Sequence, residues 1–136
     1  MRPLCVVSLI FSSFLLNCAS GNSIPVSAPT DHTVTEDDND KEIQVARGDT
    51  ITVRLGSQLG TGYGWYVTSG PGNLLEQTSQ RPKIESNKNS KPGSSEVEVF
   101  QFTAKASGRV RLEFSYRRPD KDSAAQKTFH VFINIQ

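Results

Sequence analysis

The most distinctive chemical feature of the chain is a glycine-rich segment in which Gly60, Gly62 and Gly64 fall within five residues. Glycine tolerates a positive φ and lets the backbone approach a partner closely, so this spacing is typical of a tight turn or a binding loop. Tyr63 and Trp65 flank the third glycine. We expect Trp65 to be a structural core residue, and Tyr63 either to contact a partner or to pack. A phosphate site is not indicated, because neither a Lys-Ser/Thr pair nor a helix follows the glycines.

Two further segments combine turn residues with groups that could contact a partner. Gly93, Ser94 and Ser95 form a turn of small residues just before a strand-like segment. Arg118 and Pro119 follow another strand-like segment. A solvated arginine is the ordinary outcome on a loop, but the adjacent proline restricts the backbone and favours a binding role for Arg118.

Other residues that could carry catalysis or bind a metal are few or poorly placed. Asp37, Asp38 and Asp40 suggest calcium, but the later ligands of an EF-hand loop are absent, and we expect a solvated turn. His32 and His130 lie near opposite ends of the domain sequence and have no partner cysteine, so neither a metal site nor a nucleophilic dyad is predicted. No serine stands in a Gly-x-Ser-x-Gly elbow. The sequence therefore predicts no enzyme activity, no cofactor and no metal.

Length and composition narrow the class of protein. The 136 residues favour one domain, and 35% hydrophobic with 21% charged residues favour a folded core over disorder. The formal net charge of +1 argues against a nucleic-acid partner, which needs a clustered positive surplus. Both cysteines, Cys5 and Cys18, lie within the first eighteen residues. A disulfide scaffold, a cysteine-based zinc site and a cysteine nucleophile are thus excluded from the folded part.

Residues 1–20 have the three parts of a secretory signal peptide. Arg2 is followed by an apolar stretch over 4–16 and then by small residues at 19–21. The stretch is too short for a membrane span, and no later segment approaches about 18 consecutive apolar residues. We therefore expect an exported protein with no transmembrane helix.

The end of this signal allows two interpretations. The segment Leu15-Leu16-Asn17-Cys18 resembles a bacterial lipobox, in which Cys18 would carry a lipid anchor, although Asn17 stands where a smaller residue is usual. Cleavage after Ala19 or Ser20 is the alternative. The protein is accordingly expected to be a membrane-anchored lipoprotein, periplasmic or secreted.

In the rest of the chain, polar and apolar residues alternate in the pattern typical of β-strands. A linker over 21–30, rich in Ser, Pro, Gly and Asn, precedes a single domain over 31–136. Seven to eight short strands, with turns every 8–12 residues or so and no disulfide, predict an all-β immunoglobulin-like β-sandwich. An apparent change of the apolar face between Val99 and Phe100 suggests a β-bulge. The expected strands are 33–35, 42–45, 50–55, 65–68, a short one near 83–84, 97–105, 109–116 and 128–135.

Three segments, in order, resemble the chagasin-type inhibitors of papain-like cysteine proteases. Segment 61–65 (Thr-Gly-Tyr-Gly-Trp) is similar to the second half of the family's Asn-Pro-Thr-Thr-Gly-Tyr/Phe-x-Trp loop. Gly93 matches the first glycine of the Gly-x-Gly-Gly loop, and segment 116–119 (Tyr-Arg-Arg-Pro) matches the Arg-Pro-Trp loop. The chain departs from these motifs at Gly60, which replaces a threonine, and at Asp120, which replaces the tryptophan.

The resemblance implies a monomeric, reversible protein inhibitor that uses no cofactor. Its three loops, at one end of the sandwich, would occlude the active-site cleft of a papain-like cysteine protease. The protease-binding residues that it implies are Gly60, Thr61, Gly62, Tyr63, Gly93, Ser94, Ser95, Arg118 and Pro119. The alternatives are a non-inhibitory cell-surface or periplasmic protein-binding module of the same fold, and a purely structural envelope lipoprotein.

Overall fold

The computed structural model describes residues 27–86, 91, 94–120 and 122–136. The expected signal peptide over 1–20, with Cys18, lies outside the described residues. So do positions 21–26 of the expected linker, and Gly93. The part of the linker that is described, 27–30, is exposed and has no regular secondary structure.

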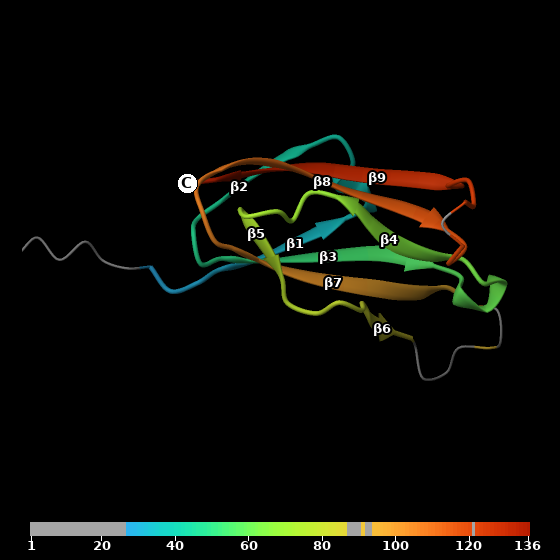
Figure 1. Ribbon diagram of the computed structural model, residues 1–136. Helices are drawn as coiled ribbons and strands as arrows, with labels where there is room; N and C mark the ends of the chain where they lie inside the picture. The colour runs from blue at the N-terminus through green and yellow to red at the C-terminus, as the bar shows by residue number, and fades with distance from the viewer. Residues whose placement is uncertain (1–26, 87–90, 92–93, 121) are drawn as a thin grey trace, which may run out of the picture.

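Two β-sheets pack face to face, which confirms the predicted all-β sandwich (Figure 1). One sheet has the order β1-β3-β7-β5, with β6 also paired to β7, and the other has the order β2-β9-β8-β4. The described residues form the strands β1 (Asp31–Thr35), β2 (Glu42–Val45), β3 (Thr50–Ser57), β4 (Gly64–Ser69), β5 (Leu75–Gln77), β6 (Lys83–Glu85), β7 (Glu96–Ala104), β8 (Gly108–Arg117) and β9 (Lys127–Ile135). Two 3-10 turns, η1 (Glu36–Asp38) and η2 (Leu59–Thr61), complete the elements.

These nine strands exceed the seven to eight that the sequence predicts. The additional strand is β5, whose three residues pair antiparallel with β7 from Leu75 opposite Ala104 to Gln77 opposite Phe102. Three residues are too few to show an alternating pattern, so only the pairing reveals this strand.

Alternating apolar side chains build the core between the sheets. On β3 the inward residues Ile51, Val53 and Leu55 are fully buried. The inward residues of β8 and β9 are also buried, except Val110, which is partly buried. Phe114 on β8 lies at the centre, with its ring centroid 5.0 Å from that of Phe100 on the opposite sheet. Edge contacts of this kind add about 1 kcal/mol to the burial of the rings.

The bulge predicted between Val99 and Phe100 is wrong. The register of β7 on β3 runs unbroken from Thr103 opposite Thr50 to Glu96 opposite Ser57. Phe100 faces the core, whereas Val99 faces outward and is still only 6% exposed. Val99 lies between Arg54 on β3 and Lys83 on β6, so a strand flanks it on each side. Val99 and Phe100 are therefore both buried because β7 is covered on both of its faces. No residue is inserted into the strand as a β-bulge would require.

The buried carboxylate of Asp49 forms hydrogen bonds that hold the start of the domain in place. Asp49, 6% exposed, accepts hydrogen bonds from the backbone N–H groups of Thr30 (3.0 Å) and Ala46 (2.9 Å). It also bonds the ring of His32 at 2.8 Å. The two backbone bonds, with that from His32, hold the pKa of Asp49 below its ordinary value. Asp49 thus connects the residue before β1 with the turn after β2. The strands β1 and β2 belong to different sheets.

We expect Asp49→Ala to lower the free energy of unfolding by about 2 kcal/mol at pH 7, since it leaves two backbone donors without their acceptor. The pKa of Asp49 is lowered on folding, so its contribution is present above the unfolded pKa of about 3.9 and is lost as the pH falls through the folded value. Urea denaturation at pH 7 and at lower pH measures both effects. Asp37→Ala, at an exposed position, is the control, and equal stability of the two variants at pH 7 would contradict this role.

Candidate functional site

Strand pairing brings the predicted loops to one end of the sandwich. Ser57 at the end of β3 lies opposite Glu96 at the start of β7, and Gly64 at the start of β4 lies opposite Arg117 at the end of β8. The first loop (residues 58–63) connects the two sheets at this end (Figure 1). Ser94 and Ser95, which precede β7, and the third loop (residues 118–120), which follows β8, therefore share this end, hereafter the loop end.

The first loop is a closed turn of backbone with little side chain. The N–H and the hydroxyl of Thr61 both donate to the carbonyl of Gln58, at 3.0 and 2.6 Å. The N–H of Gly62 donates to the carbonyl of Leu59 at 2.9 Å. Gly62 ends the turn at φ 81°, in the left-handed region that favours glycine. Gly60, Thr61 and Gly62 are exposed, so this turn presents its backbone to a partner.

Three hydrogen bonds between the sheets hold the base of this loop. The indole N–H of Trp65 donates to the carbonyl of Gly56 at 2.9 Å, and its backbone N–H donates to Glu98 Oε1 at 3.1 Å. The N–H of Gln58 donates to the hydroxyl of Tyr116 at 3.0 Å. Trp65 itself is 4% exposed, in keeping with a core position. Each bond joins a residue of the β3–β7 sheet, or one next to it, to a residue of the β4–β8 sheet.

Glu98 is a buried residue at the site that sequence reasoning missed. It is 2% exposed on the inward face of β7, the face that also carries Phe100 and Phe102. Burial raises the pKa of the Glu98 carboxyl, and the hydrogen bond from the Trp65 N–H opposes that rise. A charged residue at an inward position of an alternating strand was the signal that could have identified it.

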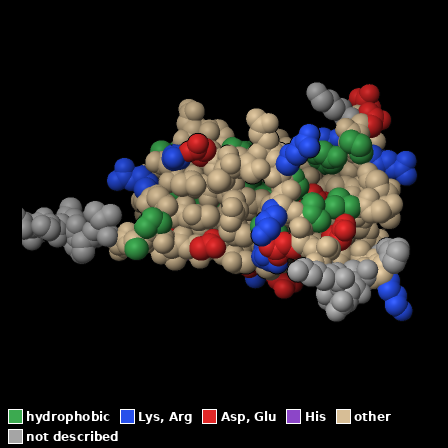
Figure 2. Space-filling model, turned by 90° about the horizontal axis from the view of Figure 1, so that it is seen from below, with side chains coloured by type: hydrophobic (Ala, Val, Ile, Leu, Met, Phe, Trp, Pro, Cys, Tyr) green, Lys and Arg blue, Asp and Glu red, His purple; other side chains and the backbone are tan. Residues whose placement is uncertain are grey.

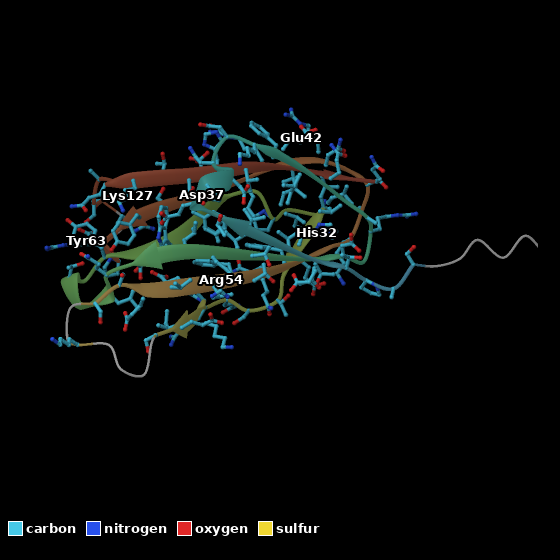
Figure 3. All side chains as sticks on the ribbon, turned by 180° about the vertical axis from the view of Figure 1, so that it is seen from behind. His32, Asp37, Glu42, Arg54, Tyr63 and Lys127 are labelled. Atoms are coloured by element: carbon cyan, nitrogen blue, oxygen red, sulfur yellow. The ribbon has the colours of Figure 1, made fainter. Side chains whose placement is uncertain are left out.

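Aromatic rings and cations connect the first loop to the third. Tyr63 stacks on Tyr116 with 5.7 Å between ring centroids, and Trp65 packs on the same Tyr116 at 5.2 Å. The Arg118 guanidinium lies 5.1 Å from the centroid of Tyr63, and the Lys127 ammonium lies 5.5 Å from that of Tyr116. Figure 3 shows Tyr63 and Lys127 at the loop end, far from His32. Tyr63 is half-buried and packs against the core, which is one of the two roles expected for it from the sequence.

The third loop is shaped from within by Arg117. Its guanidinium donates to the carbonyls of Arg118 (3.0 Å) and Asp120 (3.1 Å), and it lies 4.4 Å from the ring centroid of Tyr66. Arg118 and Pro119 are exposed, as a partner contact requires. The sequence singled out Arg118 for binding and assigned no role to Arg117. In the structure, Arg117 supports the loop and Arg118 faces outward over Tyr63.

The middle segment is described only in part. The N–H and the hydroxyl of Ser94 both bond the carbonyl of Lys91, at 3.0 and 2.5 Å, which forms a turn. Ser94 and Ser95 are exposed, and Ser95 shares a shallow hollow with Gln58 and Lys127. The structure thus brings Ser95 beside the base of the first loop, while Gly93 is outside the described residues.

A groove of about 620 Å³ opens beside the first and third loops, between β4 and β6. Buried Glu98 and Phe100 line it together with Tyr63 and Pro119 of the loops. Its outer rim includes Ile84, which is 42% exposed. Seen from the side of β6, hydrophobic side chains gather near the loop end with basic side chains beside them (Figure 2).

Within the described residues, no three His, Cys, Asp or Glu side chains gather in a way that could hold a metal ion. No helix in that part of the chain has the length and apolar character needed to cross a membrane.

Known proteins share this architecture. Over 107 residues the chain is 29% identical to Amoebiasin-1 of Entamoeba histolytica, covering 76% of this chain and 98% of the relative. The crystal structure of the cysteine protease inhibitor EhICP2 from Entamoeba histolytica matches with a TM-score of 0.70 at 18% identity, over 81% of this chain and 99% of that one. PbICP-C, solved in complex with falcipain-2, matches with a TM-score of 0.51 at 17% identity, over 81% and 93% of the two chains.

The family model described as "Chagasin family peptidase inhibitor I42" matches residues 44–133. The matched range runs from within β2 into β9 and includes the first and third loops and the turn before β7. Because this range covers most of the domain, the chain belongs to the chagasin family of peptidase inhibitors, a family of inhibitors and not of enzymes.

Proposed function

We propose that the protein reversibly inhibits papain-family cysteine proteases by inserting its loop end into their active-site cleft. The observation that carries this proposal is the closed, exposed glycine turn of the first loop, held at its base by hydrogen bonds between the sheets. Family membership supports an inhibitor. The related PbICP-C, which binds falcipain-2, supports a protease as the partner.

The first loop has the shape that such inhibition needs. Gly60 and Gly62 have no side chains, and the space around each is open, so their backbone can enter a narrow cleft. The carbonyls of Gln58 and Leu59 already accept hydrogen bonds within the turn. The segment is therefore curled and does not offer the extended backbone of a substrate. Since the turn is formed before binding, little conformational entropy is lost on association.

Residues beside this turn supply the contacts at the rim. Arg118 and Pro119 are exposed next to Tyr63, and Ser94 and Ser95 are exposed before β7, with Ser95 beside the base of the first loop. Arginine and tyrosine are enriched among residues that contribute most to protein interfaces. Asp120 is exposed where the family has a tryptophan, so the third loop relies on Arg118 and Pro119 for this contact.

We further propose that the inhibitor acts outside the cytoplasm as a monomer. The export pattern over 1–20 supports this location, and Cys18 is the position that would carry a lipid anchor. One domain that meets the protease with a single end needs no second copy.

The inhibition itself is tested by titrating papain, and then a cathepsin L-type protease, with purified residues 21–136. We expect stoichiometric loss of protease activity at nanomolar concentrations, with the inhibitor recovered uncleaved. A folded protein that does not inhibit at roughly 10–50 μM would contradict the proposal, because standard interfaces of preorganised inhibitors bind far more tightly. The loop end would then belong to a different protein partner.

We expect Gly62→Glu to raise the inhibition constant for papain by about 100-fold, because the side chain would project from the turn into the cleft. Gly48→Glu is the matched control. Gly48 also has a positive φ, 91°, and open space around it, but it lies at the opposite end of β3. Both variants place a side chain at a positive φ, and only the first should lose inhibition. Equal inhibition constants for the two would show that the first loop does not enter the cleft.

Arg118→Ala should raise the inhibition constant by about tenfold and lower the free energy of unfolding by no more than about 1 kcal/mol, since Arg118 is exposed and its guanidinium lies over the ring of Tyr63. Arg109→Ala serves as the control. Arg109 lies 4.4 Å from the ring centroid of Phe132 and pairs with Glu42, away from the loops. If the two variants have the same inhibition constant, the third loop does not contact the protease.

A further inference from the structure

A carboxylate lies buried directly beneath the first loop, and the contacts proposed for the protease do not use it. Glu98 is 2% exposed, and its nearest backbone partner is the N–H of Trp65, 3.1 Å away. Keeping a carboxylate out of water costs free energy unless hydrogen bonds compensate it. An apolar side chain of similar length would fill the same space without that cost, so the carboxylate needs another reason to be there.

The bond from Trp65 to Glu98 crosses the sandwich. Glu98 lies on β7 of one sheet, and Trp65 lies on β4, the edge strand of the other. The N–H of Trp65 points away from its neighbour strand β8 and toward Glu98. An edge strand has no further strand to accept such a donor, and the carboxylate occupies the place of that missing acceptor.

The residue between the loop and Trp65 fits closely against this carboxylate. A Cβ added at Gly64 would lie 3.4 Å from Glu98 Oε1 and 3.7 Å from the side chain of Leu59. Gly64 is therefore enclosed between the carboxylate and the η2 turn. The backbone that leaves the first loop therefore passes within van der Waals contact of the Glu98 carboxylate.

We propose that Glu98 is the positioning residue of the first loop, which it holds in its binding shape by fixing the backbone N–H of Trp65 where the loop enters β4. On the indole side, the bond from Trp65 to Gly56 fixes the same residue to β3. Trp65 is thus held to the opposite sheet through both of its N–H groups. The expected effect of Glu98 on inhibition depends on the proposed function. Its expected effect on the order of the loop does not.

The electrostatics of the site agree with such a role. Burial raises the pKa of Glu98, and the half-buried Glu96 on the same strand raises it further. The hydrogen bond from the Trp65 N–H, together with the nearby Ser57, acts in the opposite direction. The hydrogen bond from Trp65 is the largest influence that lowers the pKa of Glu98, and it opposes the larger rise that burial causes.

The test compares Glu98→Met, which removes the acceptor but keeps the length, with Glu98→Gln, which retains an oxygen acceptor. Glu96→Met is the matched control on the same strand. We expect Glu98→Met to raise the inhibition constant for papain by about tenfold, the ratio expected when a buried donor loses its acceptor. We also expect faster hydrogen exchange at the amides of Trp65 and Gly62. Glu98→Gln should restore both properties to within about threefold of the unchanged protein, and Glu96→Met should alter neither.

The outcomes separate this proposal from the proposed function. If the unchanged protein fails to inhibit, amide exchange still decides whether Glu98 holds the loop. A folded Glu98→Met protein with unchanged exchange at Trp65 and Gly62 would overturn the positioning role. If Glu98→Met does not fold, the Trp65 amide resonance of the unchanged protein is followed with pH. It should titrate with a midpoint above the ordinary glutamate value of about 4.3, and a resonance insensitive to pH in this range would overturn the proposal.

Discussion

Trp65 is bonded to the opposite sheet through both of its N–H groups, and the arrangement of the loop end depends on these two bonds. They lie immediately after the first loop, while the bond from Gln58 to Tyr116 lies at its start. The loop is thus fixed at both ends to a frame made from both sheets. A six-residue connection with two glycines would otherwise sample many conformations, and binding would have to order it.

Hydrogen bonds fix the two sheets to each other at both ends of the sandwich, and apolar contacts hold them together in the middle. Hydrophobic contact between the sheets is strong but not directional, whereas hydrogen bonds require defined distances and angles. Asp49 supplies directional bonds at one end of β3, and Trp65, Glu98 and Tyr116 supply them at the other. The core between them, around Phe114, contributes burial and aromatic contacts. These end bonds therefore define how the two sheets sit on one another.

The features that could be predicted from the sequence are those set by the residue pattern within a single strand or loop. Alternation located the long strands and their inward faces, and the order of three short motifs indicated the family. What it missed depends on neighbours that are distant in the chain. Val99 suggested a bulge because its cover comes from β6, and β5 is recognised only by its pairing with β7. Glu98 lacked an evident role, because its partner Trp65 lies 33 residues away on the other sheet.

The bonds that shape the first loop draw mostly on backbone atoms. Gln58 contributes an N–H and a carbonyl, Leu59 a carbonyl and Gly56 a carbonyl, and none of these bonds uses their side chains. The side chains at positions 58 and 59 can therefore change while the turn keeps its form, whereas Thr61 and Gly62 are constrained by a side-chain hydrogen bond and by a positive φ. This separation lets the inhibitor's range of target enzymes diverge during evolution without a loss of foldability, and it makes the tip a natural place to graft new recognition sequences.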